Sequence, residues 1–359
     1  MKEKIVVHFG GGALGRGLVI PVLIKSGWDV ILVDTNQNLI NQIKENGNTY
    51  ILDVTDDTKR YQKMRLYDVI NSKEEEVKLN EILKETDIVT TSVRRENLKY
   101  IAPTLCKAWE NTENNHLVIC CENVEDIGKY FKSLLVENGL KYKDLEKVKV
   151  PDTIIDRICA TDKEMNVISE KFHECSVDKN IVEKTGVRFI DSVNDIKAHF
   201  YRKRYLMNTY ADLVSFLGKK QGLKYLYEAV KDDSINERII PYMNLLKKVL
   251  NLTYNISFKE LNNWQDIYRQ RLSNEKIPRD IDTVARNLEV KMGLEERFIA
   301  PLINLLELKE DITDGLPIIK ELIDCHENKE IMFKKINEMW SKTSKGKQLK
   351  ELFNSYIAE

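Results

Sequence analysis

Three glycines near the N-terminus have the types and spacing of a phosphate-binding turn. Gly10, Gly12 and Gly15 follow the apolar run Ile5–Phe9 and open the helical pattern Leu14–Ser26. In such a G-x-G-x-x-G turn, the first glycine permits the tight bend and the second lets the backbone approach a pyrophosphate. The third lets the helix pack close to the sheet. Backbone N–H groups at the helix N-terminus would hold the pyrophosphate, so this segment predicts a dinucleotide site.

An acidic residue stands where a dinucleotide site needs one. Asp34 follows the apolar run Val30–Val33, close to the spacing of about 20 residues that this motif requires. Its carboxylate would accept hydrogen bonds from the adenosine ribose hydroxyls and repel a 2′-phosphate. We therefore predict NAD as the cofactor, bound by Gly10, Gly12, Gly15 and Asp34. The alternative is a glycine turn in an unrelated fold, which would not require this strand, helix and acid in order.

Alternating strands and helices must position these residues. The runs Ile88–Thr91 and Leu117–Cys120 read as further buried strands, because β-branched and apolar residues dominate them. Strands that alternate with helices predict a Rossmann-like, doubly wound, mostly parallel sheet. Extended segments at 154–159 and 167–177 should enlarge the same domain.

The texture of the chain changes near Asp195. Glycine and proline become sparse, and amphipathic helical patterns follow, such as Leu223–Val230, Pro241–Leu250 and Phe298–Leu306. We therefore predict two domains. Residues 1–195 would form the NAD-binding domain, and residues 196–359 an all-helical domain for substrate binding and catalysis.

Composition and charge exclude several classes of function. The formal net charge is −1, so no overall field recruits nucleic acid or an anionic membrane. No apolar run is long enough to span a membrane or to form a signal-peptide core. The six cysteines form no C-x-x-C pair, which is typical of reduced thiols in a cytoplasmic protein. The five histidines lack the spacing of metal ligands. We expect a cytoplasmic, metal-independent protein whose oligomeric state is open, a monomer included.

A succession of short strings resembles the polyol-specific long-chain dehydrogenases. The strings are His8–Gly17, Asp87–Val93, Ile101–Pro103, Cys121–Asn123, Ile155–Ile158, Phe216–Lys219 and the stretch Arg271–Pro301. Each alone is unspecific, but they occur in the family's order over most of the chain. The resemblance implies a metal-independent NAD enzyme that interconverts a polyol phosphate and a ketose phosphate. Mannitol 1-phosphate and fructose 6-phosphate are the first candidates.

The family's catalytic signature, Lys-x4-Asn-x2-His, reads here as Lys203, Asn208 and Ala211. The resemblance makes Lys203 the general base that removes the hydroxyl proton as hydride leaves. Burial or cationic neighbours could depress the pKa of such a lysine; the candidate neighbours are Arg157, Arg202 and Arg204. Asn208 and Asn123 would hold the alkoxide oxygen as charge develops. Asp156, Arg157 and Arg286 would contact the substrate.

Each assignment has a structural alternative. Lys203 could belong to a solvated basic face with its arginine neighbours. Asn123 could end a strand, and Asn208 could cap a helix. Asp156 and Arg157 could form an ion pair.

Three departures from the family pattern bear on the substrate. Ala211 replaces the histidine, Arg94 stands where the family usually has glycine, and the segment Arg286–Lys291 lacks one proline and one arginine of the family's motif. The altered positions suit an NAD enzyme of the same fold with another sugar or sugar acid as substrate, or a catalytically inactive NAD-binding sensor. The intact Lys203 and Asn208 argue against the sensor, and Ala211 argues for it.

Overall fold

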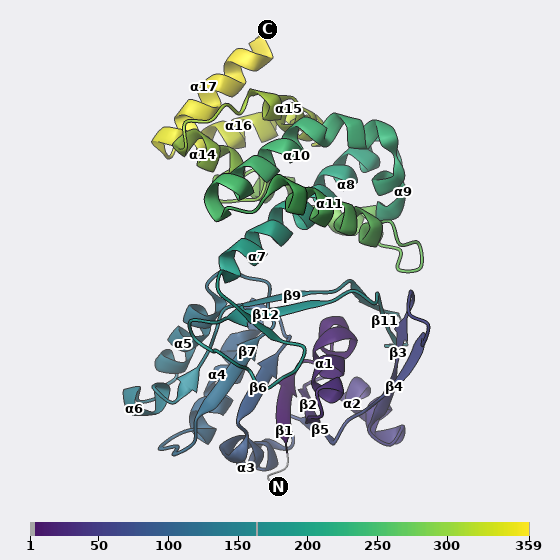
Figure 1. Ribbon diagram of the computed structural model, residues 1–359, viewed down its shortest axis with the longest axis vertical. Helices are drawn as coiled ribbons and strands as arrows, with labels where there is room; N and C mark the ends of the chain where they lie inside the picture. Colours follow the sequence, from purple (N-terminus) through teal and green to yellow (C-terminus); the bar gives the residue numbers. More distant parts are fainter. Residues whose placement is uncertain (1–3, 163, 359) are drawn as a thin grey trace. The chain divides into compact units, whose positions relative to one another are not determined.

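The computed structural model describes residues 4–162 and 164–358. The chain divides into two compact units, Met1–Phe200 and Tyr201–Glu359 (Figure 1). The chain passes from one to the other within α7 (Ile196–Lys203). The predicted boundary at residue 195 lies directly before this helix and stays a prediction.

A six-stranded sheet is the centre of the N-terminal unit. Its order is β5-β2-β1-β6-β7-β8, and every neighbouring pair is parallel. The strands are β1 (Ile5–Phe9), β2 (Asp29–Asp34), β5 (Asp68–Asn71), β6 (Ile88–Thr91), β7 (His116–Cys120) and β8 (Val148–Lys149). The strand order reverses between β1 and β6. Ligands of such sheets bind beyond the carboxyl ends of the strands at this reversal. The predicted Rossmann-like sheet is confirmed.

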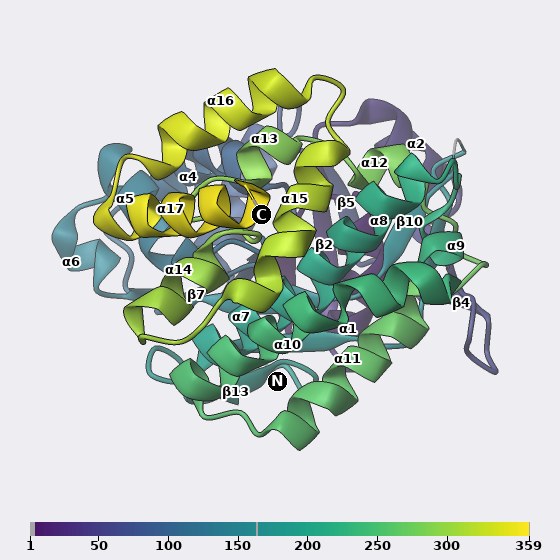
Figure 2. The ribbon, with the colours of Figure 1, turned by 90° about the horizontal axis from the view of Figure 1, so that it is seen from above.

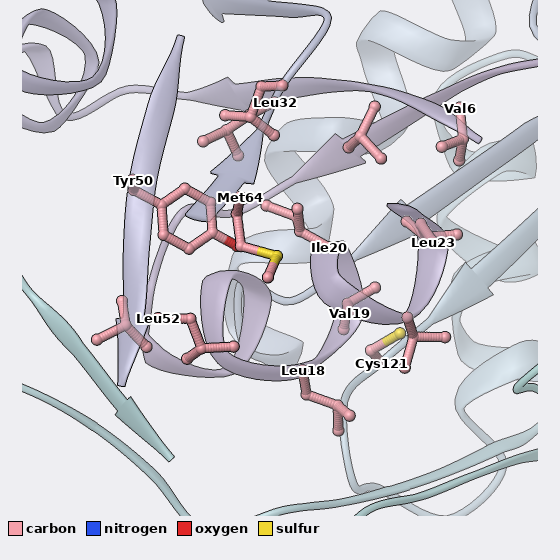
Figure 3. Close-up of a cluster of buried hydrophobic side chains, with 14 of the residues drawn as sticks. Val6, Leu18, Val19, Ile20, Leu23, Leu32, Tyr50, Leu52, Met64 and Cys121 are labelled. Carbon is pink, nitrogen blue, oxygen red and sulfur yellow. The ribbon is translucent and has the colours of Figure 1, made fainter. Parts of the chain in front are cut away.

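Helices cover both faces of this sheet (Figure 1). Side chains alternate along a strand, so Val6 enters one core cluster and Val7 the other. Figure 3 shows the first cluster, to which Leu18 and Leu23 belong together with Leu32 of the sheet. The helices of this unit are α1 (Ile20–Lys25), α2 (Gln37–Glu45), α3 (Glu76–Glu85), α4 (Leu98–Ala108), α5 (Ile127–Glu137) and α6 (Tyr142–Leu145), with a short 3-10 turn, η2 (Arg95–Asn97).

Two smaller sheets complete the N-terminal unit. One has the order β10-β11-β3-β4 and the other β13-β12-β9. Their strands are β3 (Thr49–Val54), β4 (Tyr61–Arg65), β9 (Thr153–Asp156), β10 (Cys159–Thr161), β11 (Val167–Ser169), β12 (Glu174–Asp178) and β13 (Asp191–Val193). The extended segments expected at 154–159 and 167–177 therefore lie in this unit, where they form separate sheets beside the parallel one.

The C-terminal unit is helical, as predicted, and has no strand within the described residues 201–358. Its helices include α8 (Tyr210–Lys220), α9 (Leu226–Lys231), α10 (Asp233–Tyr254), α11 (Phe258–Leu272), α12 (Ile281–Val284), α13 (Leu288–Lys291), α14 (Ala300–Glu307), η4 (Thr313–Gly315), α15 (Leu316–Asp324), α16 (Lys329–Trp340) and α17 (Ser344–Ala358). Pro301 and Pro317 lie in the first turns of α14 and α15, where a missing N–H costs nothing. The last helix, α17, packs against α14 and α16 (Figure 2). No helix in the described part of the chain is both long and apolar enough to cross a membrane.

Each unit also contains a π-helical segment that the sequence patterns did not predict. The segment η1 (Gly15–Val19) opens the helix after the glycine turn, and η3 (Arg204–Thr209) continues α7. Within η3, the Thr209 hydroxyl donates to the Arg204 carbonyl, 2.9 Å away and five residues earlier. Such wide turns are rare in proteins, and those that occur are often found at functional sites.

Candidate active site

The glycine turn has the geometry that its spacing predicts. Gly10 has a φ of 108°, which only glycine adopts without strain. A Cβ added at Gly15 would collide with the Gly10 carbonyl oxygen and lie 2.7 Å from His8 Nε2. A Cβ added at Gly12 would meet no atom within 4 Å. Gly10 thus makes the bend, Gly15 lets the helix approach β1, and Gly12 faces open space.

That open space belongs to a cavity of about 690 Å³ in the N-terminal unit. Its volume is within the range of about 300–1,000 Å³ that is usual for small-molecule and cofactor sites. The lining includes Gly10, Gly12, Asp34, Lys73 and Arg94. An open backbone at a helix N-terminus, beside an acid at the end of β2, fits a dinucleotide.

Asp34 holds the glycine turn as well as facing the cavity. One carboxylate oxygen accepts the Gly11 N–H at 2.6 Å, and the other accepts the N–H groups of Thr35 and Asn36 at 2.7 and 2.8 Å. A carboxylate offers about four lone-pair sites, so room remains for a ribose hydroxyl. The role of Gly11 was not predicted. A Cβ there would lie 2.6 Å from Leu39.

A buried histidine lies beneath the turn. His8 Nε2 donates to the Gly10 carbonyl at 3.0 Å, because that oxygen can only accept, and the Thr90 hydroxyl then donates to Nδ1 at 2.8 Å. The Ser92 hydroxyl lies 3.0 Å from the same Nε2. Burial lowers the pKa of His8 to about 4, so the ring is neutral near pH 7. The sequence signal for this residue is one polar side chain in an otherwise apolar strand.

Two polar residues follow β7. Asn123 accepts the Ile155 N–H through its side-chain oxygen at 3.1 Å, which directs its NH₂ group to other acceptors. Glu122 is buried and accepts the Thr91 hydroxyl and the Val93 N–H, each at 2.8 Å. Burial raises the pKa of the Glu122 carboxyl. Asn123 was predicted as a site residue, and Glu122 was not.

The candidate substrate residues of the N-terminal unit lie at the end of β9. Asp156 is buried. The Arg157 guanidinium donates to the carbonyls of Glu170 and Gly17 at 2.6 and 2.8 Å. These contacts give Arg157 a structural role between β9 and η1. A role of either residue at the substrate stays a prediction.

The catalytic signature lies across η3. Residues five apart are about 140° apart around an α-helix of 3.6 residues per turn, but hydrogen bonds of a π-segment join residues i and i+5. The π-segment therefore brings Asn208 closer to the face that carries Lys203 than an α-helix would. Ala211, three residues further on, follows Asn208 on that face. Asn208 lies inside the segment and caps no helix.

Lys203 does not belong to a solvated basic face. Arg202 and Lys203 are only 4% and 7% exposed, so that alternative is wrong. Arg202 stacks on the Trp264 ring at 3.8 Å, and Arg204 donates to the Glu295 carbonyl at 3.0 Å. Residues two positions apart on a helix face different directions, which explains why Arg202 and Arg204 have separate partners.

A buried ion cluster follows the signature. Asp212 accepts Lys291 Nζ at 2.9 Å and Arg297 Nη1 at 3.0 Å. These cations are 79 and 85 residues away in the chain, so no local pattern predicts the cluster. Arg286 precedes Lys291 of this cluster by five residues, and its side chain is exposed. It lines a separate cavity of about 540 Å³ together with His326.

The fold and the glycine turn define the class of the protein, a Rossmann-type dehydrogenase with a helical second domain. Residues 4–189 match the family model of the mannitol dehydrogenase Rossmann domain, and residues 195–350 match that of the mannitol dehydrogenase C-terminal domain. The chain therefore belongs to the mannitol dehydrogenase family.

Similar proteins extend over nearly the whole chain. Mannitol-1-phosphate 5-dehydrogenase of Pyrenophora tritici-repentis is 29% identical, over 89% of this chain and 85% of that protein. The protein of the same name from Streptococcus pneumoniae is 28% identical, over 95% of this chain and 93% of that protein.

Solved structures share the fold. Pseudomonas fluorescens mannitol 2-dehydrogenase, in a ternary complex with NAD and D-mannitol, superimposes with a TM-score of 0.69 at 14% identity, over 90% of this chain and 79% of that one. A D-sorbitol dehydrogenase in substrate-free form gives a TM-score of 0.72 at 15% identity, over 89% of this chain and 80% of that one.

Proposed function

We propose that this protein is a cytoplasmic, NAD-dependent oxidoreductase that interconverts a polyol phosphate and a ketose phosphate. Mannitol 1-phosphate and fructose 6-phosphate are the first candidates. The observation that carries the proposal is the similarity to mannitol-1-phosphate 5-dehydrogenases over 85% and 93% of their length. The similarity includes both units, so it covers the glycine turn and the lysine–asparagine signature alike.

The cofactor would be held by the glycine turn and Asp34. When bound, the nicotinamide supplies the hydride chemistry, as acceptor in polyol oxidation and donor in ketose reduction. The open backbone at Gly12 would admit the pyrophosphate, and the negative charge of Asp34 would repel the additional phosphate of NADP. Asp34→Asn keeps a side-chain acceptor for the Gly11 N–H but removes the charge. It should therefore narrow the difference between the dissociation constants of NADH and NADPH.

Lys203 would exchange the proton of the reaction. Its Nζ would take the proton of the reacting hydroxyl during oxidation and return it to the carbonyl oxygen during reduction. A buried position suits this role, because it limits exchange of the proton with bulk water.

Two side-chain amides would stabilise the reacting oxygen. Asn208 and Asn123 would each donate an N–H to this oxygen as negative charge develops on it. The Ile155 N–H holds the oxygen of the Asn123 amide and so presets which end of that amide can donate. Asp156, Arg157 and Arg286 are the proposed contacts to the rest of the substrate.

A second candidate is an enzyme of the same fold that acts on another sugar or sugar acid. The observation that favours it is Ala211, whose buried methyl group cannot donate a hydrogen bond to a substrate hydroxyl. The same alanine favours the third candidate, a dinucleotide sensor without turnover.

The test is NADH consumption with a panel of fructose 6-phosphate, other ketose phosphates, free ketoses and keto sugar acids. The proposal expects the highest kcat/KM with a ketose phosphate and a much lower value with the matching free ketose. A preference for an unphosphorylated sugar or a sugar acid would establish the second candidate. Binding of NADH without turnover of any compound would leave the sensor.

A further inference from the structure

Arg94 has a backbone conformation that residues other than glycine rarely adopt. Its φ is 73° and its ψ is 150°, a region occupied almost only by glycine. Asp126, Asn255 and Asn287 also have positive φ, but their ψ values are 33°, 31° and 39°. Those values belong to the left-handed helical region, which Asn and Asp tolerate. Arg94 therefore carries a strain that these turn residues do not.

Hydrogen bonds on both sides of Arg94 maintain this conformation. The Val93 N–H donates to Glu122 at 2.8 Å, and the Asn97 side-chain amide donates to the Val93 carbonyl at 2.7 Å. The Asn97 N–H donates to the Arg94 carbonyl at 3.0 Å. A strained residue persists only when its surroundings determine its conformation in this way, and such residues cluster at functional sites.

The strained segment lies against the glycine turn. The Ser92 N–H donates to the Phe9 carbonyl at 2.8 Å, and the Ser92 hydroxyl donates to the Gly10 carbonyl at 3.1 Å. Arg94 and Gly12 line the same cavity of about 690 Å³.

The Arg94 guanidinium is available to a ligand. Its side chain is exposed, and within residues 4–162 and 164–358 no carboxylate pairs with it. The next residue differs, because the Arg95 guanidinium lies over the Tyr130 ring, 4.1 Å from its centroid. Arg94 is thus the arginine of this segment that lines the cavity.

We propose that Arg94 binds the phosphate groups of the dinucleotide. The backbone at the helix N-terminus supplies N–H donors from one side, and a guanidinium supplies charge and paired donors for phosphate oxygens. The strained backbone is retained because it presents the guanidinium to the cavity at this point. The inference rests on the nicotinamide dinucleotide as cofactor and is independent of which polyol is the substrate.

Three variants separate the charge from the strain. Arg94→Ala removes the charge and keeps the strain, Arg94→Gly removes both, and Arg94→Lys keeps both. The matched control is Arg95→Ala. The measurements are the dissociation constants of NADH and ADP-ribose by calorimetric titration, the melting temperature, and KM for fructose 6-phosphate. ADP-ribose contains the pyrophosphate without the nicotinamide.

Loss of the charged hydrogen bonds in Arg94→Ala and Arg94→Gly should weaken both ligands by about 10- to 100-fold. Arg94→Lys keeps the charge but not the paired donors, so it should lose less affinity than Arg94→Ala. Arg95→Ala should remain within a few-fold of the unaltered protein. Arg94→Gly should also melt at a higher temperature than Arg94→Ala, because glycine occupies this conformation without strain.

Unchanged affinities in Arg94→Ala and Arg94→Gly would overturn the inference. A rise in KM for fructose 6-phosphate with unchanged affinity for ADP-ribose would also overturn it, because the bound phosphate would then be that of the substrate. If the unaltered protein binds neither NADH nor ADP-ribose, both the inference and the proposed cofactor are wrong. Loss of affinity for NADH and ADP-ribose in Arg94→Ala and Arg94→Gly, with normal binding by the unaltered protein, supports the inference and leaves the proposed function intact.

Discussion

The two units present their candidate residues in opposite ways. In the N-terminal unit, the candidate cofactor site is made mainly of backbone, with the Gly10–Gly12 turn bordering a cavity and side chains such as His8 and Asp34 holding that turn. In the C-terminal unit, the candidate catalytic residues Lys203 and Asn208 are side chains on the helix formed by α7 and η3, and Lys203 is buried. We therefore expect substitution of the glycines to change the shape of the backbone, and with it cofactor affinity or stability. Substitution of Lys203 or Asn208 should instead remove a chemical group and lower kcat.

The sharpest test of this difference is Lys203→Ala. If Lys203 is the general base, kcat should fall by about 10²–10⁴-fold, while the dissociation constant of NADH stays nearly unchanged. Steady-state kinetics and cofactor titration measure the two quantities. Lys197→Ala is the control, because this lysine lies on the same helix and forms surface ion pairs with Glu125 and Asp126. A loss in kcat of less than tenfold would mean that Lys203 is not the base.

The next largest effect should come from the two amides. Asn208→Ala and Asn123→Ala should each lower kcat by about 10²–10³-fold, the usual effect of removing one oxyanion donor, and change KM less. Asn123→Ala should also lower the melting temperature, since it removes the acceptor of the Ile155 N–H. Equal losses in kcat and in cofactor affinity would argue that the substituted residue acts by shape. For Asn208, which lies in the C-terminal unit, that result would contradict the contrast between the units.

A pair of glycine variants tests the role of shape in the N-terminal unit. Gly12→Ala adds a methyl group to open space, so the melting temperature should hardly change. The same methyl group would crowd a bound pyrophosphate and make binding less favourable by about 1–3 kcal/mol. The affinity for NADH should therefore fall roughly 5- to 150-fold. Gly15→Ala should instead destabilise the fold, because its methyl group collides with the Gly10 carbonyl. Unfolding curves and NADH titration distinguish the two, and unaltered NADH affinity in Gly12→Ala would place the pyrophosphate elsewhere.

The smallest effect concerns pH and His8. The pKa of His8 is lowered to about 4 by burial, while the nearby negative charge of Asp34 opposes the shift. Between pH 6.5 and 4 the unfolded chain therefore binds more protons than the folded one, and the free energy of unfolding falls as the pH falls. At pH 5 the loss attributable to His8 is about 2 kcal/mol. Urea unfolding of the unaltered protein and of His8→Gln at pH 5 and 7.5 measures it. Parallel changes in the two proteins would show that His8 does not titrate in this way.

Local patterns in the sequence determined the fold class and most of the candidate cofactor site. Strand, glycine turn, helix and Asp34 all lie within the first 34 residues, and each follows from nearby residue types. Parallel strands joined by helices leave few possible sheet orders. The helical half was also predictable, because amphipathic periodicity depends on neighbours along the chain.

Only the tertiary structure decided the features that depend on distant residues. Glu122 pairs with Thr91 and Val93 across the sheet, and this contact helps to hold Arg94 in a conformation that its residue type disfavours. Asp212 in α8 pairs with Lys291 at the end of α13 and with Arg297 in the segment before α14. The π-segment after Lys203 has no local signature, since its residues suit an α-helix equally well and packing determines which one forms. Residue types and spacing therefore identified the candidates for chemistry, and long-range packing set their burial, partners and direction.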